Sequence, residues 1–457
     1  MAQLGIGSDE WRVQRTYLLF VGIAVLSGLF FVNLAQSASL IDVYHLAQKN
    51  DPTFQSAYFI KSVTDESRKQ AISRLLPTLD GSAEYMRRSQ DIKSSDNDVF
   101  GSGKTDFDTT SYSITLTQPV FHWDLIVGLK QSKAEIFRAE AEYILAQQEL
   151  IIRVADLYFM ALATQDQLAF AKTELSAVEK HLELASNRLE MGLIPITDLY
   201  DAKARMSTTQ AQTIEAQNQL DDALQALREV TDESIDQLQM LPVEIPLVSP
   251  QPTDLDSWIK GGLEQNLAVE IQRQVVEVSR QEVRRQNTGH YPTVDLVARY
   301  NRTDTEGTIF GGGSDVGTGD LVLQLNVPLY QGGFVSSRVR EAKYQLNVAR
   351  QELIKQQRMV ERQTRAAFLG TKSDIRRVEA LRQSVFSIQL ALEAKQEGFL
   401  SGLYTSLTVL DAERDLSLVR IDYAQARYNY ILNSLKLKQA VGSLISQDLV
   451  DLDQWFQ

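Results

Sequence analysis

Cysteine is missing from the sequence, so disulfide bonds, thiolate metal sites and a thiol nucleophile are all excluded. The four histidines lie far apart and form no HxH or HxxxH pair, so we expect no metal site. No nucleophile–base pair and no cofactor-binding loop can be recognised either. These absences predict a protein that is not an enzyme and that carries neither a cofactor nor a metal.

Proline is also scarce, and acidic residues outnumber basic ones. The chain has only 10 prolines, and none of them follows Pro328. Because proline is the strongest helix breaker and good helix formers dominate the proline-free stretches, we expect long helices. The formal net charge of −13 argues against binding to nucleic acid or to an anionic membrane surface. With 44% hydrophobic and 23% charged residues, the chain is neither a disordered polymer nor a typical multi-span helical membrane protein.

The N-terminal segment 1–38 has the order of a secretory signal peptide: a basic region, an apolar run at 17–35 and then small residues. We expect cleavage between Ala35 and Ser39. The apolar run is also long enough to span a bilayer, so an uncleaved anchor is the alternative. Since no later segment has about 18 uninterrupted apolar residues, any further membrane contact would be made by β-strands.

The rest of the chain repeats itself. Three landmarks of the first half return in the same order in the second half: 76–89 matches 291–303, 116–134 matches 325–343, and MGLIPITDLYDAKAR at 191–205 matches SGLYTSLTVLDAERD at 401–415. Repeats of this kind indicate duplicated structural units. We therefore expect a first repeat, a proline-rich linker, a second repeat and a C-terminal equatorial tail, at 39–229, 230–256, 257–440 and 441–457.

Each repeat begins with a helix, which is followed by two segments whose residues alternate between apolar and polar. In 111–117, for example, Tyr112, Ile114 and Leu116 alternate with serine and threonine. Such alternation predicts strands, at 78–90, 109–119, 292–303 and 319–329. A soluble half-buried sheet would show the same alternation, but the signal peptide and the flanking helices favour a transmembrane barrel.

The strands of each repeat are followed by two long helices joined by a sharp turn. Apolar residues recur at spacings of three and four, as in coiled-coil packing. The predicted helices are 125–190, 196–229, 334–397 and 403–440. At 1.5 Å per residue, a helix of roughly 60 residues is ~90 Å long. A globular domain has little use for such a length.

Four strands are too few to close a barrel, because single-chain barrels start at about eight strands. An open sheet edge cannot face lipid, since its backbone groups would lack hydrogen-bond partners. Several copies of the chain must therefore pool their strands. A dimer would supply eight strands and a trimer twelve, and the residues by themselves do not choose between these two assemblies. Polar inward residues favour the wider barrel.

The choice between dimer and trimer comes from several motifs that resemble a known family. AQKNDPTF near the mature start, QNTGHYPTVDL at 286–296, VPLYQGGFVSSRVREAKY at 327–344 and the segment 410–444 resemble the TolC family of outer-membrane efflux proteins. The resemblance implies an α+β membrane protein, built as a homotrimer with a 12-stranded transmembrane β-barrel. A 12-helix α-barrel of very long coiled-coil helices and a small mixed equatorial region would complete it.

The resemblance also implies a function. The protein would be an exit duct in the outer membrane that extends into the periplasm and contacts outer-membrane lipid. It would work with a periplasmic adaptor protein and an inner-membrane transporter, ABC-type or proton-driven, to export drugs or secreted proteins. The duct would be a passive conduit gated at its periplasmic tip. The alternative is a coiled-coil envelope scaffold without a channel, which would explain the helices but not the strands.

The resemblance assigns residues to the periplasmic constriction. In the family, two acidic rings one helical turn apart narrow the tunnel. Asp411 matches one ring, and Thr408 stands at the position of the other, so we expect a weaker constriction. The two residues are three apart and share a helix face.

The family also closes its tip with a network of charges and hydrogen bonds. Thr197 and Asp198 match its first-repeat members, whereas Phe399 and Tyr404 stand where the family has tyrosine and arginine. We therefore expect a looser lock, or one that depends on other residues. Asp198 also suits a helix start, which is the simpler interpretation of this residue.

The sharp turns at Gly192 and Gly402 should form the helix tips that contact the adaptor. Glycine allows a backbone conformation that other residues resist. The leucines that follow, Leu193 and Leu403, complete the predicted contact. The simpler alternative is that all four are only turn residues.

Overall fold

The computed structural model describes residues 37–94, 103–235, 237–307 and 312–456. The predicted signal segment up to residue 36 lies outside the described residues. Ala38 is described: its N–H donates to the Gln237 carbonyl (2.9 Å), and its own carbonyl accepts from Gln239 N–H (3.1 Å). The folded part therefore includes the last residue of the segment that we predicted as a signal.

Four antiparallel strands form one sheet in the order β1-β2-β3-β4. They span Thr78–Ile92, Gly103–Phe121, Thr293–Thr305 and Ser314–Asn326. β2 and β4 begin earlier than the apolar alternation indicated, because polar residues next to the hairpin turns also pair. β4 ends at Asn326 rather than at 329, two residues before Pro328, which has no N–H to donate.

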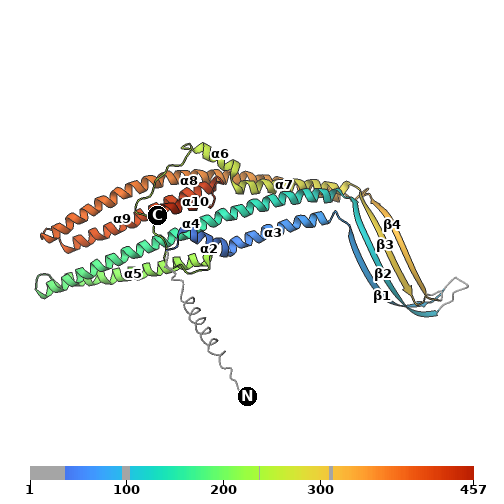
Figure 1. Ribbon diagram of the computed structural model, residues 1–457, viewed down its shortest axis with the longest axis horizontal. Coiled ribbons are helices and arrows are strands. Elements are labelled where there is room, and N and C mark those ends of the chain that lie inside the picture. Colours follow the sequence, from blue (N-terminus) through green and yellow to red (C-terminus); the bar gives the residue numbers. More distant parts are fainter. Residues whose placement is uncertain (1–36, 95–102, 236, 308–311, 457) are drawn as a thin grey trace, which may run out of the picture.

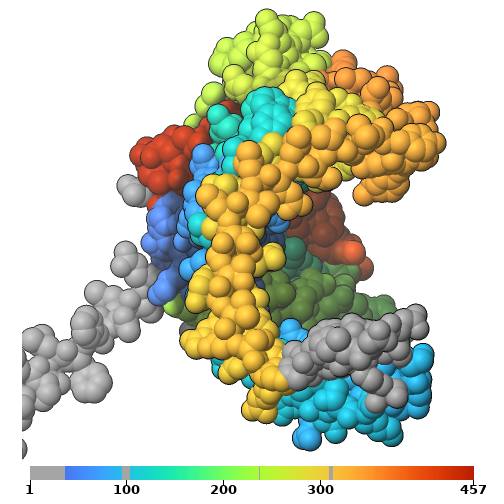
Figure 2. All heavy atoms as spheres, turned by 90° about the vertical axis from the view of Figure 1, so that its right-hand side faces the viewer, coloured from blue at the N-terminus to red at the C-terminus, as the bar shows by residue number. Residues whose placement is uncertain are grey.

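The register of the strands gives the sheet one apolar and one polar face. Residues directly opposite each other in an antiparallel sheet point to the same side. One such row across the sheet is apolar throughout, namely Leu79, Leu116, Ala298 and Leu321. A row on the other face is polar throughout, namely Ser82, Ser113, Asn301 and Thr318. Seen from the sheet end, the molecule forms an open arc rather than a closed ring (Figure 2).

Two helices precede the strands of each repeat, where we predicted one. They are α2 (Leu40–Asn50) with α3 (Pro52–Ser73), and α6 (Leu255–Gln265) with α7 (Leu267–Asn287). Asp51 and Asn266 interrupt them, and each side chain accepts backbone N–H bonds at the start of the second helix. The apolar spacing continues across both breaks, which hides the one at Asn266. The break at Asp51 does have a local signal that the prediction overlooked, because an aspartate followed by Pro52 is typical of a helix start.

The long helices α4 (Trp123–Glu190) and α8 (Phe334–Leu400) have 68 and 67 residues, about 100 Å each. They turn back as α5 (Ile196–Thr231) and α9 (Ser406–Ala440). The sheet lies at one end of the molecule and the two helix turns at the other (Figure 1). Near the sheet the helices pack in the order α3–α4–α7–α8, and near the turns in the order α5–α4–α9–α8. Among the described helices, none has both the length and the apolar character needed to cross a membrane.

The main hydrophobic core lies at the waist, where α2, α4 and α9 meet the segment 237–248 and the short C-terminal helix α10 (Gln447–Asp453). Tyrosine hydroxyls hold the irregular linker against the helices. Tyr158 donates to the carbonyl of Gln239 (2.8 Å), and Tyr423 donates to that of Val243 (2.9 Å). The region that we predicted as a linker thus carries part of the core.

A half-buried acid at the waist predicts a pH-dependent stability. Tyr428 of α9 donates a hydrogen bond to Asp166 of α4 (2.7 Å). Burial raises the pKa of Asp166, although the bond from Tyr428 and the charge of Arg427 oppose this. The folded state thus binds this proton more tightly than the unfolded state. Protonated Asp166 therefore stabilises the fold. This contribution to the free energy of unfolding is fully present below the pKa of Asp166 in the unfolded chain and is lost as pH rises through its pKa in the folded protein.

Asp166→Asn should therefore be more stable relative to the wild type at about pH 7 than at about pH 4. The urea midpoint of the helical circular-dichroism signal, measured for both proteins at both pH values, checks this. An equal difference between the two proteins at both pH values would contradict the expectation.

Candidate functional site: the helical tips

The two helix turns have nearly the same backbone geometry. Gly192 and Gly402 both have positive φ, 69° and 80°. In each turn the following leucine donates its N–H to a carbonyl five residues back: Leu193 to Arg188 (2.9 Å) and Leu403 to Gly398 (2.7 Å). A side chain at either glycine would be strained at this φ. Both leucines are exposed, so the structure presents an apolar side chain at each turn.

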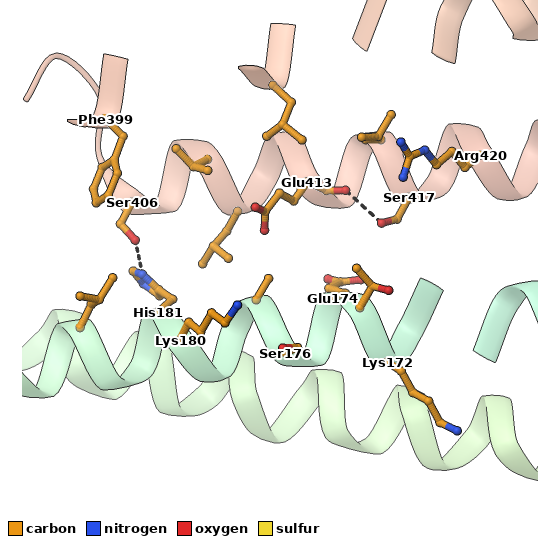
Figure 3. Close-up of a pocket in the computed structure, with 17 residues that line it drawn as sticks. Lys172, Glu174, Ser176, Lys180, His181, Phe399, Ser406, Glu413, Ser417 and Arg420 are labelled. Carbon is orange, nitrogen blue, oxygen red and sulfur yellow. Dashed lines mark hydrogen bonds between the residues drawn. The ribbon is translucent and has the colours of Figure 1, made fainter. Parts of the chain in front are cut away.

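The hairpin α4/α5 meets the hairpin α8/α9 along a seam between α4 and α9. His181 of α4 makes a hydrogen bond through Nδ1 with the Ser406 hydroxyl of α9 (Figure 3). A cavity of about 700 Å³ lies at this seam and is lined from both hairpins. Burial lowers the pKa of His181, and the positive charges of Arg188 and Arg205 lower it further.

The predicted constriction acid has a basic partner that sequence reasoning missed. Nη1 of Arg205, on α5, lies 3.3 Å from Oδ1 of Asp411, on α9. Nη2 of Arg205 lies 3.9 Å from Oε1 of Glu174, on α4. The repeat alignment contained a signal, because Arg205 matches Asp415 and the two repeats thus carry opposite charges at this position.

Thr408 contributes to the start of α9. Its hydroxyl contacts the hydroxyl of Thr405 (2.9 Å), and its N–H donates to the same Thr405 oxygen (3.3 Å). Thr405 thereby caps the helix. Thr408 carries no charge, which leaves Asp411 as the one acid of the two predicted constriction residues.

The four predicted lock residues do not form one cluster in the single chain. Thr197 donates to Asp198 (3.3 Å), and both are exposed. Phe399 lies under the guanidinium of Arg188, 5.6 Å from the ring centre. The ring of Tyr404 packs against the backbone of α8. Within the described part of the chain, no hydrogen bond or ion pair joins the first-repeat pair to the second-repeat pair, so the lock stays a prediction.

The described residues can also be compared with the requirements of a metal site. Among them, no group of three or more histidine, aspartate or glutamate side chains could hold a metal ion. The tips instead combine exposed leucines, a seam between hairpins and a few charged pairs. This arrangement suits contact with other helices.

Comparison with known families decides the identity. The profile of the family described as outer membrane efflux protein matches residues 43–232 and 258–443. The chain belongs to this family. Each matched segment contains one strand pair and one long helical hairpin. The protein is thus an outer-membrane efflux and secretion duct, as the resemblance implied.

Known outer membrane efflux proteins and related secretion proteins are similar over most of their length. TolC of Escherichia coli K12 is 30% identical over 445 residues, which cover 95% of this chain and 88% of TolC. The proteases secretion protein PrtF of Dickeya chrysanthemi is 27% identical over 448 residues, or 97% of this chain and 96% of PrtF. The crystal structure of the Campylobacter jejuni CmeC outer membrane channel superposes with a TM-score of 0.75 at 16% identity, covering 92% and 89% of the two chains. The fold class is confirmed by this likeness.

Proposed function

We propose that the duct is a homotrimer, in which three sheets form a 12-stranded barrel and the long helices form a 12-helix tunnel. The observation that carries this proposal is the open sheet, in which β1 and β4 each have one neighbour within the described chain. Unpaired edges cannot face lipid. β4 and α8 lie along one edge of the molecule, whereas β1, α3 and α5 lie along the other. Copies placed side by side therefore close both barrels at once.

The duct works as a passive conduit without catalysis, and its energy comes from a partner. We infer that a periplasmic adaptor protein contacts the tips at Gly192, Leu193, Gly402 and Leu403 and connects them to an inner-membrane transporter. The exposed leucines support this, because an apolar side chain at an exposed turn gains free energy when a partner covers it. The related efflux and secretion proteins suggest that the cargo is a drug or a secreted polypeptide.

The resting tip is narrowed by Asp411 and Thr408 of the three copies. In the trimer, Thr197 and Asp198 take part with Phe399 and Tyr404 in closing the tip. Two contacts of the single chain support a closed seam at this level: the bond between His181 and Ser406, and the guanidinium of Arg188 over Phe399. These replace the missing basic partner that the family has at position 404.

The double variant Leu193→Glu/Leu403→Glu should lose export but keep the channel. Two carboxylates per chain, one at each helix tip, would have to be desolvated under the adaptor, at a cost of several kcal/mol. We expect active efflux of a fluorescent dye from cells of the source organism to fall to the level of a deletion strain. Channel activity of the purified variant in planar bilayers should match that of the wild type.

The control places glutamate at two exposed apolar positions of the waist linker, far from the tips: Met240→Glu and Val248→Glu. This variant should keep export. Full dye efflux by the tip variant would contradict the adaptor contact. A wild-type protein that inserts into bilayers without ever conducting, even after the Asp411→Ala change, would contradict the duct.

A further inference from the structure

Arg205 is a charged residue near the tips that forms ion pairs with both repeats. It lies on α5 and reaches a carboxylate on α4, Glu174, and a carboxylate on α9, Asp411. The pair of Arg205 and Asp411 joins residues 206 positions apart in the chain. No other ion pair in the described chain connects the α4/α5 hairpin to the half of α9 that lies near the turns.

The two carboxylates, Glu174 and Asp411, stabilise the positive charge of the Arg205 guanidinium. Its side chain is 24% exposed, against 19% for Glu174 and 55% for Asp411. Nη2 is shielded from solvent and, among the described residues, has no hydrogen-bond partner. A half-buried cation without neighbouring anions is unfavourable, so the position of Arg205 is set by the acids on both sides. Since Asp411 is the more exposed of the two, its pairing is the one that salt and mutation change most readily.

We propose that Arg205 neutralises Asp411 at the resting tip and latches the two hairpins of each chain together. This inference rests on the proposed function, in which Asp411 narrows the tunnel. A ring of three Asp411 carboxylates alone would favour cations. The Arg205 guanidinium beside each of these carboxylates offsets the charge of Asp411, and Thr408 adds none. The resting constriction is then a ring of ion pairs rather than an acidic ring.

Removing Arg205 and removing Asp411 should change the ion selectivity of the channel in opposite directions, but both should open the tip. Loss of Arg205 leaves unpaired Asp411 carboxylates at the constriction, whereas loss of Asp411 leaves guanidiniums that pair with Glu174 alone. Both losses break the same link between hairpins, so either one widens the tip. Because the two residues act as one pair, losing both should widen the tip no further than losing one.

Purified full-length protein in planar bilayers under a KCl gradient tests the pair through reversal potential and conductance. The variants are Arg205→Gln, Asp411→Asn, their double combination and the conservative Arg205→Lys. The matched control is Lys203→Gln, which removes a positive charge from the same helix. The Lys203 ammonium lies over the ring of Tyr200 (5.7 Å) and forms no ion pair within the described chain.

We expect Arg205→Gln to raise the preference for K⁺ over Cl⁻ by roughly twofold or more, and Asp411→Asn to shift it toward Cl⁻. The double variant should return to the wild-type reversal potential and show the raised conductance of either single variant. Arg205→Lys should keep the wild-type selectivity, because a lysine retains the charge.

Two results overturn the pairing while leaving the duct intact. One is an Arg205→Gln channel that conducts and selects ions like Lys203→Gln. The other is a double variant whose conductance gain equals the sum of the two single gains, since this shows that the residues act independently. A wild type and variants that all insert without conducting overturn the proposed duct itself.

Discussion

Leu321→Arg should abolish assembly of the duct in the outer membrane. Leu321 belongs to the fully apolar row of the sheet, and its side chain is 74% exposed in the single chain. A buried arginine in the middle of the lipid-facing band of a barrel costs ~2–4 kcal/mol, and a trimer carries three of them. We expect no heat-resistant oligomer on gels and no protein in the outer-membrane fraction.

The control is the same substitution one residue further along. Val322 points to the opposite face, where the polar rows of the sheet lie. Because that face lines the inside of the barrel, Val322→Arg should leave oligomer and fractionation unchanged. Loss of assembly in both variants, or in neither, would show that the apolar face does not contact lipid.

Phe159→Ala should lower the free energy of unfolding of the helical region by ~3–5 kcal/mol, the range for large-to-small changes of a buried aromatic residue. Phe159 is 1% exposed at the centre of the waist core. Its ring stacks on Tyr428 (centroids 5.5 Å apart) and meets Tyr158 edge-on (5.7 Å). The alanine leaves a cavity between α4 and α9 that neither helix can fill. The midpoint of urea unfolding, followed by helical circular dichroism, measures the loss.

Phe137→Ala removes the same ring from an exposed position of the same helix. We expect this control to change the free energy of unfolding by less than about 1 kcal/mol. Equal destabilisation by the two variants would mean that the waist core is not the stabilising centre of the helical region.

The main elements could be predicted from local patterns. Alternation marked four strands, and spacings of three and four marked the long helices, because each pattern records which face of an element is buried. The prediction missed the breaks that divide the helix before each strand pair into two helices. The break at Asn266 escaped notice because the capping side chain interrupts the hydrogen bonds of the helix but not its apolar spacing. The break at Asp51 was predictable from Pro52, which suits the first position of a new helix.

The candidate site was only partly predictable. The glycine turns and their leucines follow from residue type, since a positive φ favours glycine. Arg205 did not follow, because its two carboxylates belong to other helices. The four lock residues were assigned by resemblance, and in the described part of the single chain no hydrogen bond or ion pair joins the first-repeat pair to the second-repeat pair.

The sequence by itself thus determined the duplication, the long helical hairpins and the two-faced strands, because these depend on interactions within one element or between neighbours in the chain. Only the tertiary structure decided that both edges of the sheet stay open and that the linker closes the core. It also decided that Asp411 is paired with Arg205, 206 residues away. Such contacts depend on how helices are rotated against one another. That rotation results from packing over the whole length of α4, α5 and α9, which no local pattern records.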